Sequence, residues 1–331
     1  MMKRGGLATS LPNSKTQKHM NILFISPGYI PTDNNGATWM AYDFADYLKE
    51  RHNIRVVTDR AVAGAHEGVE IVPLNYGNLK QHMQWADKIV THLHLIPKIH
   101  NICRAMNLGN PYVIIHGVVN PDLLKARAKF FNIIYNSEYT RNHLKYPQPS
   151  IICRPPLIAK RYTSKKRKPQ YITLVNCHQQ KGGDILAELA ALMPEQQFMG
   201  VIGGYGAEHQ IRSTLPNVKY VENTIDMRPI YAETKILIQP SQYESYGKAV
   251  CEAMACGIPV VVTATDGLIE STGSAGVFAE RTAYDFKEKI EMVLADYDSF
   301  SKKATARAAE LVEQTETDLI NFEKFLTDGD T

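Results

Sequence analysis

Short apolar runs alternate with amphipathic stretches along most of this chain. The first run, residues 21–26, ends at a Pro-Gly pair, and a helical pattern over residues 38–51 and a second apolar run at 54–58 follow it. Uninterrupted apolar runs are typical of parallel strands that are buried on both faces. Strand alternating with helix therefore predicts an α/β fold built on doubly wound parallel sheets.

A basic, proline-bounded segment over residues 156–169 interrupts this alternation and is typical of an interdomain linker. Its basic residues are Lys160, Arg161, Lys165, Lys166, Arg167 and Lys168. The alternation then restarts, with strands expected at residues 171–176, 198–202, 236–239 and 259–263, helices at 184–193 and 246–256, and a helical end from 284 to 326.

The 331 residues are enough for two domains, because a single core usually stops growing at about 250–300 residues. We therefore expect two Rossmann-like domains that face each other across a cleft, with C-terminal helices that can pack back on the N-terminal domain. The expected divisions are a disordered leader at 1–19, an N-terminal domain at 20–155, the linker at 156–169 and a C-terminal domain at 170–326.

Composition excludes several classes of protein. A net charge of +3 is too small by itself to indicate nucleic-acid binding. The longest apolar runs fall short of the roughly 18 residues that span a bilayer, and the leader has no apolar core typical of a signal peptide. The five cysteines are an odd number without a C-x-x-C pair, which favours a reducing compartment. These features predict a cytoplasmic protein.

The most informative stretch lies between two expected strands and reads QPSQYESYGKAVCEAMACGIPVV. A helix is expected to begin near residues 245–247 and to end at Gly257. The free N–H groups and positive dipole end of such a helix favour a phosphate. Glu252, expected about two turns in, can accept hydrogen bonds from a ribose, and Glu244 can meet a second polyol. Spacing alone also fits two surface glutamates on an ordinary amphipathic helix.

This stretch resembles the E-x7-E motif of retaining GT-B glycosyltransferases of the family 4 class, which use nucleotide-sugar donors. A later segment, Asp266-Gly-Leu-Ile-Glu270, also fits, although the family usually has two glycines where this chain has Asp266-Gly267. The resemblance implies contacts with the donor sugar and diphosphate, and with the ribose through Glu252. The donor-binding residues that it implies here are Glu244, Ser245, Tyr246, Gly247, Lys248 and Glu252.

Three further segments resemble the same family. Lys181, which precedes Gly182, matches a lysine that holds the diphosphate, whereas Asn176 stands where the family usually has an arginine. His116 follows an apolar strand and matches a histidine that faces the donor sugar. Gly36 matches a glycine-rich turn at the diphosphate, and residues 203–206 form a second candidate turn. The resemblance thus makes His116, Lys181 and Glu244 the candidate catalytic residues.

His92 and His94 could suggest a metal pair, but no third ligand is evident, and packing or hydrogen bonding is the favoured interpretation. No D-x-D constellation accompanies the donor motifs, so neither a metal nor a cofactor is expected. The first strand-helix turn lacks the G-x-G-x-x-G of a dinucleotide-binding dehydrogenase.

The implied function is transfer of a hexose-type sugar, with retention, from a nucleoside-diphosphate sugar to an unidentified acceptor. The basic linker, with Arg127, Lys129, Arg141 and Lys145, suggests an anionic acceptor such as a cell-envelope glycolipid precursor or nucleic acid, with peripheral contact to an anionic membrane. The alternative for the linker is a solvated hinge. A non-catalytic nucleotide-sugar-binding protein and a sugar-nucleotide epimerase of similar shape remain open as alternative functions.

Overall fold

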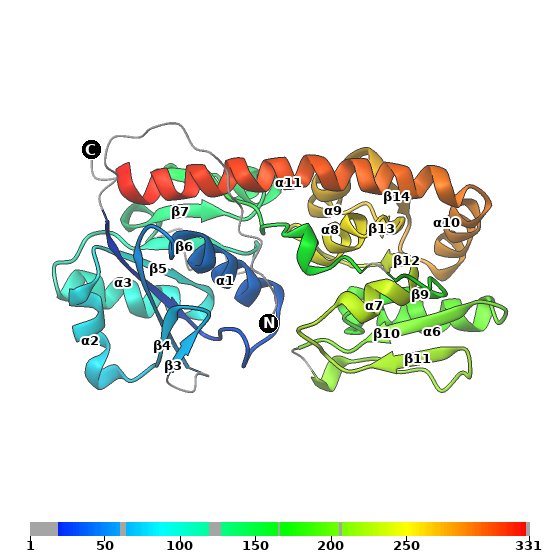
Figure 1. The fold of residues 1–331 in the computed structure, drawn as a ribbon, viewed down its shortest axis with the longest axis horizontal. Helices are drawn as coiled ribbons and strands as arrows, with labels where there is room; N and C mark the ends of the chain where they lie inside the picture. The colour runs from blue at the N-terminus through cyan, green and yellow to red at the C-terminus, as the bar shows by residue number, and fades with distance from the viewer. Residues whose placement is uncertain (1–18, 60–63, 119–126, 165, 205–206, 329–331) are drawn as a thin grey trace.

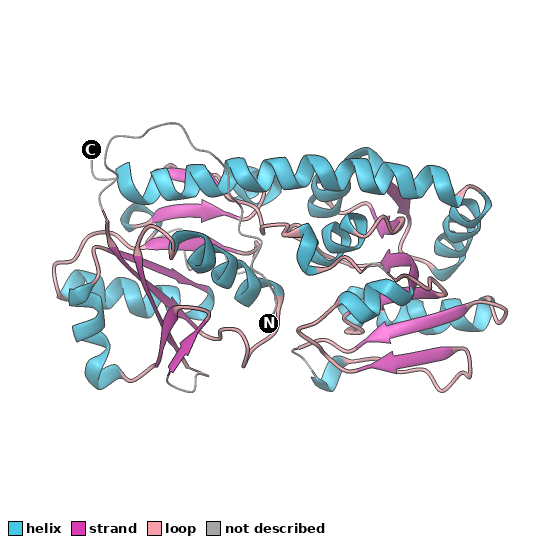
Figure 2. Cartoon of the chain, viewed as in Figure 1, coloured by secondary structure: helices cyan, strands magenta, loops and turns pink. Residues whose placement is uncertain are grey.

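The computed structural model describes residues 19–59, 64–118, 127–164, 166–204 and 207–328. Their helices and strands form two α/β domains side by side (Figures 1 and 2). Residues 1–18 of the expected leader, Lys165 of the linker and residues 205–206 of the second glycine turn lie outside the described part. The α/β class with two mainly parallel sheets agrees with the sequence prediction.

The N-terminal domain is built on an eight-stranded sheet of order β3-β4-β2-β1-β5-β6-β7-β8. Every strand pairs in parallel except β3, which is antiparallel to β4 at the edge. The strands are β1 (Asn21–Ser26), β2 (Asn53–Thr58), β3 (Gly64–His66), β4 (Val69–Pro73), β5 (Lys88–His92), β6 (Tyr112–Ile115), β7 (Asn132–Tyr135) and β8 (Ser150–Ile152). The helices are α1 (Gly36–Leu48), α2 (Tyr76–Trp85), α3 (Ile96–Ala105) and α5 (Glu138–Leu144).

The C-terminal domain is built on a six-stranded parallel sheet of order β11-β10-β9-β12-β13-β14. Its central strands are the apolar runs that the sequence singled out, and they are almost completely buried. The strands are β9 (Tyr171–Val175), β10 (Gln197–Val201), β11 (Val218–Val221), β12 (Thr234–Gln239), β13 (Val260–Thr263) and β14 (Gly276–Ala279). The helices are α6 (Gly183–Leu192), α7 (Arg228–Glu233), α8 (Lys248–Ala255), α9 (Asp266–Thr272) and α10 (Ala283–Ala295).

A long final helix, α11 (Tyr297–Asp328), runs along both domains (Figure 1). Leu311 belongs to the apolar cluster under α8, whereas Phe322 stacks on Phe44 of α1 with ring centroids 4.3 Å apart. Near its end, Glu323 accepts a hydrogen bond of 2.7 Å from Arg51. The helix therefore ties the C-terminal domain to the core of the N-terminal domain.

Arg154 joins the two domains and α11 by ion pairs. Its guanidinium lies 2.9 Å from Glu270 of α9 and 3.1 Å from Asp318 of α11. Glu270, the last residue of the Asp266–Glu270 motif, also accepts hydrogen bonds from the backbone amides of Glu138 and Tyr139 in the first turn of α5. These contacts hold the two domains against each other.

The basic segment between the domains is packed against both of them. Arg161 pairs with buried Asp43 of α1 at 2.6 Å, and its guanidinium lies over the ring of Trp39. Arg167 donates to the carbonyl oxygens of Cys256 and Thr234. These two cations are therefore bound by the protein itself, and the interpretation of a fully solvated charge run does not describe them.

Candidate functional site

A cleft of about 490 Å³ opens where the carboxyl ends of the two sheets face each other. Ligands of open α/β sheets bind outside the carboxyl ends of the strands, where the strand order reverses. The N-terminal domain contributes loops that follow β1 and β5, namely Asn34, Asn35, Gly36, Ala37, Trp39 and Leu93. The C-terminal domain contributes, among others, Asn176, Lys181, Glu244, Gly247, Lys248 and Glu252.

Lys181 and Glu244 form an ion pair in this cleft. The ammonium nitrogen of Lys181 lies 2.6 Å from Oε1 of Glu244, and both side chains are largely buried. Gln239 and Ser241 also donate to the Glu244 carboxylate, at 3.3 and 3.2 Å. The loop between β12 and α8 thus holds Glu244 in a fixed position, with a cation directly beside it that can meet an anionic ligand.

Helix α8 begins at Lys248, later than the sequence suggested, because Gly247 adopts the left-handed conformation with φ of 88°. As a glycine, Gly247 supplies no side-chain oxygen to cap the first amides of α8. These amides can therefore donate to an external anion, and Gly247 and Lys248 line the cleft. The expected start, near residues 245–247, thus falls just before the observed one.

Glu252 is the fifth residue of α8, so it lies just over one turn in rather than the expected two. Its side chain is mostly buried and accepts a hydrogen bond of 2.7 Å from the hydroxyl of Tyr231. Lys248 lies 3.7 Å from Glu252 and 3.6 Å from Asp43, and donates to the carbonyl oxygen of Pro156. Burial alone disfavours the Lys248 ammonium, yet Tyr162, Asp43 and Glu252 together raise its pKa.

Asn176, at the position where an arginine was expected, has a left-handed backbone with φ of 73°. Asparagine tolerates this conformation better than most residues. Its side-chain oxygen accepts from the amide of His178 and from Gln210, at 3.0 and 3.2 Å. The turn after β9 therefore places Asn176 in the wall of the cleft, and this side chain brings no positive charge there.

Close packing at the start of α9 requires a glycine at position 267. A Cβ on Gly267 would lie 2.4 Å from the carbonyl oxygen of Glu244 and equally close to Ser245. Asp266 is instead the first residue of α9, where an acidic side chain suits the helix dipole. The second position thus supports the Glu244 loop directly, and the first is free to vary.

The other predicted residues, Ser245, Tyr246 and His116, are not among the residues that line the cleft. Ser245 accepts a hydrogen bond of 2.9 Å from Asn136 of the N-terminal domain. The Tyr246 side chain is buried in the apolar cluster under α8, which leaves only its backbone for a ligand. His116 follows β6 and is hydrogen-bonded through its ring to His92 at 2.8 Å.

Sequence reasoning missed Tyr243, which precedes Glu244. Its hydroxyl accepts a hydrogen bond of 2.8 Å from the amide of Val118 in the N-terminal domain. A Cβ on neighbouring Gly117 would lie 2.8 Å from the same hydroxyl. The loop that carries Glu244 therefore touches the segment that follows His116.

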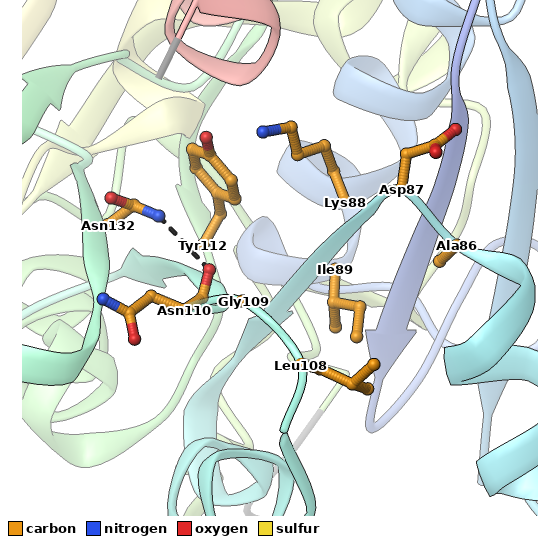
Figure 3. A pocket seen from close by; sticks show the side chains of 9 residues that line it. All are labelled: Ala86, Asp87, Lys88, Ile89, Leu108, Gly109, Asn110, Tyr112 and Asn132. Atoms are coloured by element: carbon orange, nitrogen blue, oxygen red, sulfur yellow. Dashed lines mark hydrogen bonds between the residues drawn. The ribbon is translucent and has the colours of Figure 1, made fainter. Parts of the chain in front are cut away.

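A second cavity, of about 200 Å³, lies at the opposite end of the N-terminal sheet (Figure 3). It is lined where β5, β6 and β7 begin, by residues that include Asp87, Lys88 and Tyr112. Asn132 donates to the carbonyl oxygen of Asn110 at its rim. Because ligand sites of such sheets form at the carboxyl ends, the large interdomain cleft is the candidate site.

Among the described residues, no group of three or more His, Cys, Asp or Glu side chains is arranged to hold a metal ion. One of the two D-x-D sequences, Asp296-Tyr297-Asp298, lies where α10 gives way to α11, apart from the residues that line the cleft. Nor does the described part of the chain contain a helix that is long and apolar enough to cross a membrane.

Comparison with known proteins agrees with this geometry. Residues 169–296 match the family model described as glycosyl transferases group 1. The O-antigen chain mannosyltransferase B of Escherichia coli is 39% identical over 83 residues, which are 25% of this chain and 22% of that protein. A diphospho-undecaprenol N-acetylgalactosaminyltransferase of Campylobacter jejuni is 26% identical over 137 residues, 39% of this chain and 36% of that protein. These matched stretches thus span well under half of either relative.

Solved structures resemble nearly the whole chain. HepE of Anabaena in complex with UDP and glucose has a TM-score of 0.79 and 17% identity, covering 93% of this chain and 99% of that one. WaaG, a glycosyltransferase of lipopolysaccharide biosynthesis, has a TM-score of 0.66 and 16% identity, covering 90% and 98%. The fold is therefore that of the GT-B glycosyltransferases. The match to the group 1 family model lies within the C-terminal domain, over residues 169–296.

Proposed function

We propose that this protein is a retaining glycosyltransferase that moves a hexose-type sugar from a nucleoside-diphosphate sugar to an acceptor. The observation that carries the proposal is the convergence of the Lys181–Glu244 pair, the start of α8 and Glu252 on one interdomain cleft. The group 1 domain over residues 169–296 contains all of these residues. Two HepE structures are complexes with UDP-glucose and with UDP and glucose, which supports a nucleotide-sugar donor here.

Each residue has a distinct role in this proposal. Glu252 accepts hydrogen bonds from the ribose hydroxyls, and the first amides of α8 with Lys181 hold the diphosphate. Glu244 binds the transferred sugar. Negative charge grows on the diphosphate as the glycosidic bond breaks, so a fixed cation and helix amides stabilise the transition state more than the bound donor.

Retention is supported by where the carboxylates lie. Among the described residues that line the cleft, Glu244 and Glu252 are the carboxylates, and both belong to the C-terminal, donor-side domain. Neither comes from the N-terminal side, where an acceptor docks in this proposal and where a base for in-line displacement would stand. Closure of the domains over the donor would exclude water and limit hydrolysis.

A non-catalytic nucleotide-sugar-binding protein is the second candidate, and one observation favours it. Asn176 brings no charge to the position where an arginine was expected, so the diphosphate receives less positive charge. Turnover separates the two. A transferase slowly releases nucleoside diphosphate from its donor even without an acceptor, whereas an inert binding protein returns the donor intact.

We expect activity to survive EDTA, because Lys181 and the start of α8 supply the positive charge in this account. Turnover of the donor should be equal with the chelator and with added Mg²⁺ or Mn²⁺. The measurement is the initial rate of nucleoside diphosphate release in each buffer. Loss of activity in EDTA with rescue by either metal would show that a divalent cation neutralises the diphosphate.

For the acceptor, we propose an anionic molecule and action in the cytoplasm, at or near an anionic membrane. Because Arg161 and Arg167 are bound by the protein, Lys166 and Lys168 are the cations of the segment to test. Changing both to glutamine should leave donor hydrolysis intact and reduce transfer several-fold at low salt, where charges are screened least. Transfer that stays unchanged at every salt concentration would reduce the segment to a linker.

A further inference from the structure

A row of hydrogen-bonded side chains crosses the carboxyl edge of the N-terminal sheet. Ser26 ends β1, His92 ends β5 and His116 follows β6, and these three strands are neighbours in the sheet. Ser26 Oγ lies 2.6 Å from Nε2 of His92, and Nδ1 of His92 lies 2.8 Å from Nε2 of His116. The family resemblance makes His116 a candidate catalytic residue, whereas Ser26 and His92 have no role in the proposed function.

The direction of each hydrogen bond in the row follows from the direction of the bond that Ser26 makes. Ser26 Oγ also contacts the carbonyl oxygen of Gly28, which can only accept, so the serine hydroxyl donates there. Ser26 Oγ then accepts from the N–H at Nε2 of His92. A neutral imidazole carries one hydrogen, so Nδ1 of His92 is an acceptor and takes the hydrogen from Nε2 of His116.

Both imidazole rings are neutral near pH 7. Burial lowers the pKa of His92 well below its usual range, and the neighbouring His116 lowers it further. Burial also lowers the pKa of His116, to about 4. Near pH 7 neither ring carries the second proton that would abolish the preference for one tautomer.

One ring nitrogen in this row, Nδ1 of His116, is available to a ligand. No described residue donates a hydrogen bond to it, and His116 is half-buried. The next residue, Gly117, packs against the side chains of Tyr243 and Ser245, which flank Glu244 in sequence. The loop that carries Glu244 therefore meets the segment that follows His116 across the domain interface.

We propose that His92, oriented by Ser26, is a positioning residue that fixes His116 as its Nε2–H tautomer, so that Nδ1 accepts a hydrogen bond from a hydroxyl of the transferred sugar. The sugar contact rests on the proposed function, whereas the tautomer is a property of the free protein. The expected partner of Nδ1 is a hydroxyl and not a phosphate oxygen, because an unprotonated nitrogen accepts hydrogen bonds and repels an anionic oxygen.

The tautomer can be read directly in the unmodified protein. Long-range ¹H–¹⁵N spectra of the imidazoles distinguish protonated from unprotonated ring nitrogens, and a His116→Gln variant assigns the His116 signals. We expect a protonated Nε2 and an unprotonated Nδ1 at neutral pH. A protonated Nδ1, or fast exchange between the two tautomers, would overturn the proposal without any appeal to activity.

Two substitutions of His92 separate positioning from packing. His92→Asn keeps an acceptor near the position of Nδ1, and His92→Phe fills the space without one. We expect the tautomer to persist in the asparagine variant and to be lost in the phenylalanine variant, with kcat for donor turnover about tenfold lower in the latter. His94→Phe, at the exposed neighbouring histidine, is the matched control and should change neither.

An unchanged His116 tautomer in His92→Phe would overturn the positioning role, and Ser26→Ala gives a second test of it should the phenylalanine variant not fold. Adding UDP-glucose or GDP-mannose tests the sugar contact. The nucleotide sugar that the protein binds should shift the Nδ1 signal of His116, and the corresponding nucleoside diphosphate should not. The expected tautomer with no shift from a nucleotide sugar that the protein binds and turns over contradicts the sugar contact alone. No binding and no turnover with any nucleotide sugar contradicts the proposed function. The hydrogen-bond order stands in either case.

Discussion

Replacing Lys181 with methionine should lower kcat for donor turnover by about 10²–10³-fold, the usual effect of removing one group that stabilises a developing oxyanion. The affinity for the donor should fall much less. Lys181 already faces Glu244 at 2.6 Å in the free protein, so part of its charge is neutralised before the donor binds. The stabilisation that the Lys181 ammonium provides is largest when negative charge has grown on the leaving diphosphate.

The control for this variant is another lysine–glutamate pair. Lys219 lies 3.1 Å from Glu233 on an exposed surface, and Lys219→Met should leave both turnover and affinity unchanged. Presteady-state rates and donor affinities measured for both variants give the comparison. An equal loss of ground-state affinity in Lys181→Met, with unchanged kcat, would make Lys181 an anchor for the donor and no more.

Replacing Glu252 with alanine should weaken nucleoside diphosphate binding by about 10²- to 10⁴-fold. This range corresponds to two hydrogen bonds between a carboxylate and hydroxyls, each contributing about 1.5–3 kcal/mol. The position of Glu252, just over one turn into α8, puts the carboxylate beside the amides proposed to hold the diphosphate. Calorimetry with the free nucleoside diphosphate measures the effect apart from the sugar and the acceptor.

Tyr231→Phe is the matched control, because it removes the hydroxyl that donates to Glu252 and keeps the carboxylate. We expect its affinity to change by less than about tenfold, since only one internal hydrogen bond is lost. Thermal unfolding of both variants shows whether the fold is intact. A folded Glu252→Ala protein that binds the nucleoside diphosphate as the parent does would remove Glu252 from the ribose site.

The strands predicted from the sequence are those in the middle of the sheets. β1, β9 and β13 are continuous apolar runs because neighbouring strands and helices cover them on all sides. β3 and β8 gave no such signal, since β3 is an exposed edge strand and β8 is only partly buried. Periodicity reports burial, so it finds central strands and misses edge strands.

The polar row of Ser26, His92 and His116 could not be predicted from the sequence. β5 follows β4 along the chain but lies on the other side of β1, and this crossover is what brings His92 next to Ser26. The sequence correctly favoured hydrogen bonding for His92 but named no partner. The Lys181–Glu244 pair likewise depends on the adjacency of β9 and β12, which local patterns do not encode.

The end of the chain shows a different limit. A helical end was expected from 284 to 326, and α11 is one continuous helix from Tyr297 to Asp328, through the polar stretch at Thr315. Thr315 explains how, because its hydroxyl donates to the carbonyl oxygen of Leu311 and accepts from the amide of Leu157. The helix is stabilised by its contacts with both domains, and the helix propensities of individual residues do not include such contacts.

The most direct test of the central claim is a binding and turnover screen with purified protein in EDTA buffer. UDP-glucose, UDP-N-acetylglucosamine and GDP-mannose would be added in turn, with thermal unfolding and nucleoside diphosphate release as readouts. We predict that at least one donor raises the unfolding temperature and is turned over, that Glu252→Ala loses the stabilisation and that Lys181→Met loses the turnover. Stabilisation and turnover that persist unchanged in both variants would show that the chemistry takes place outside this cleft.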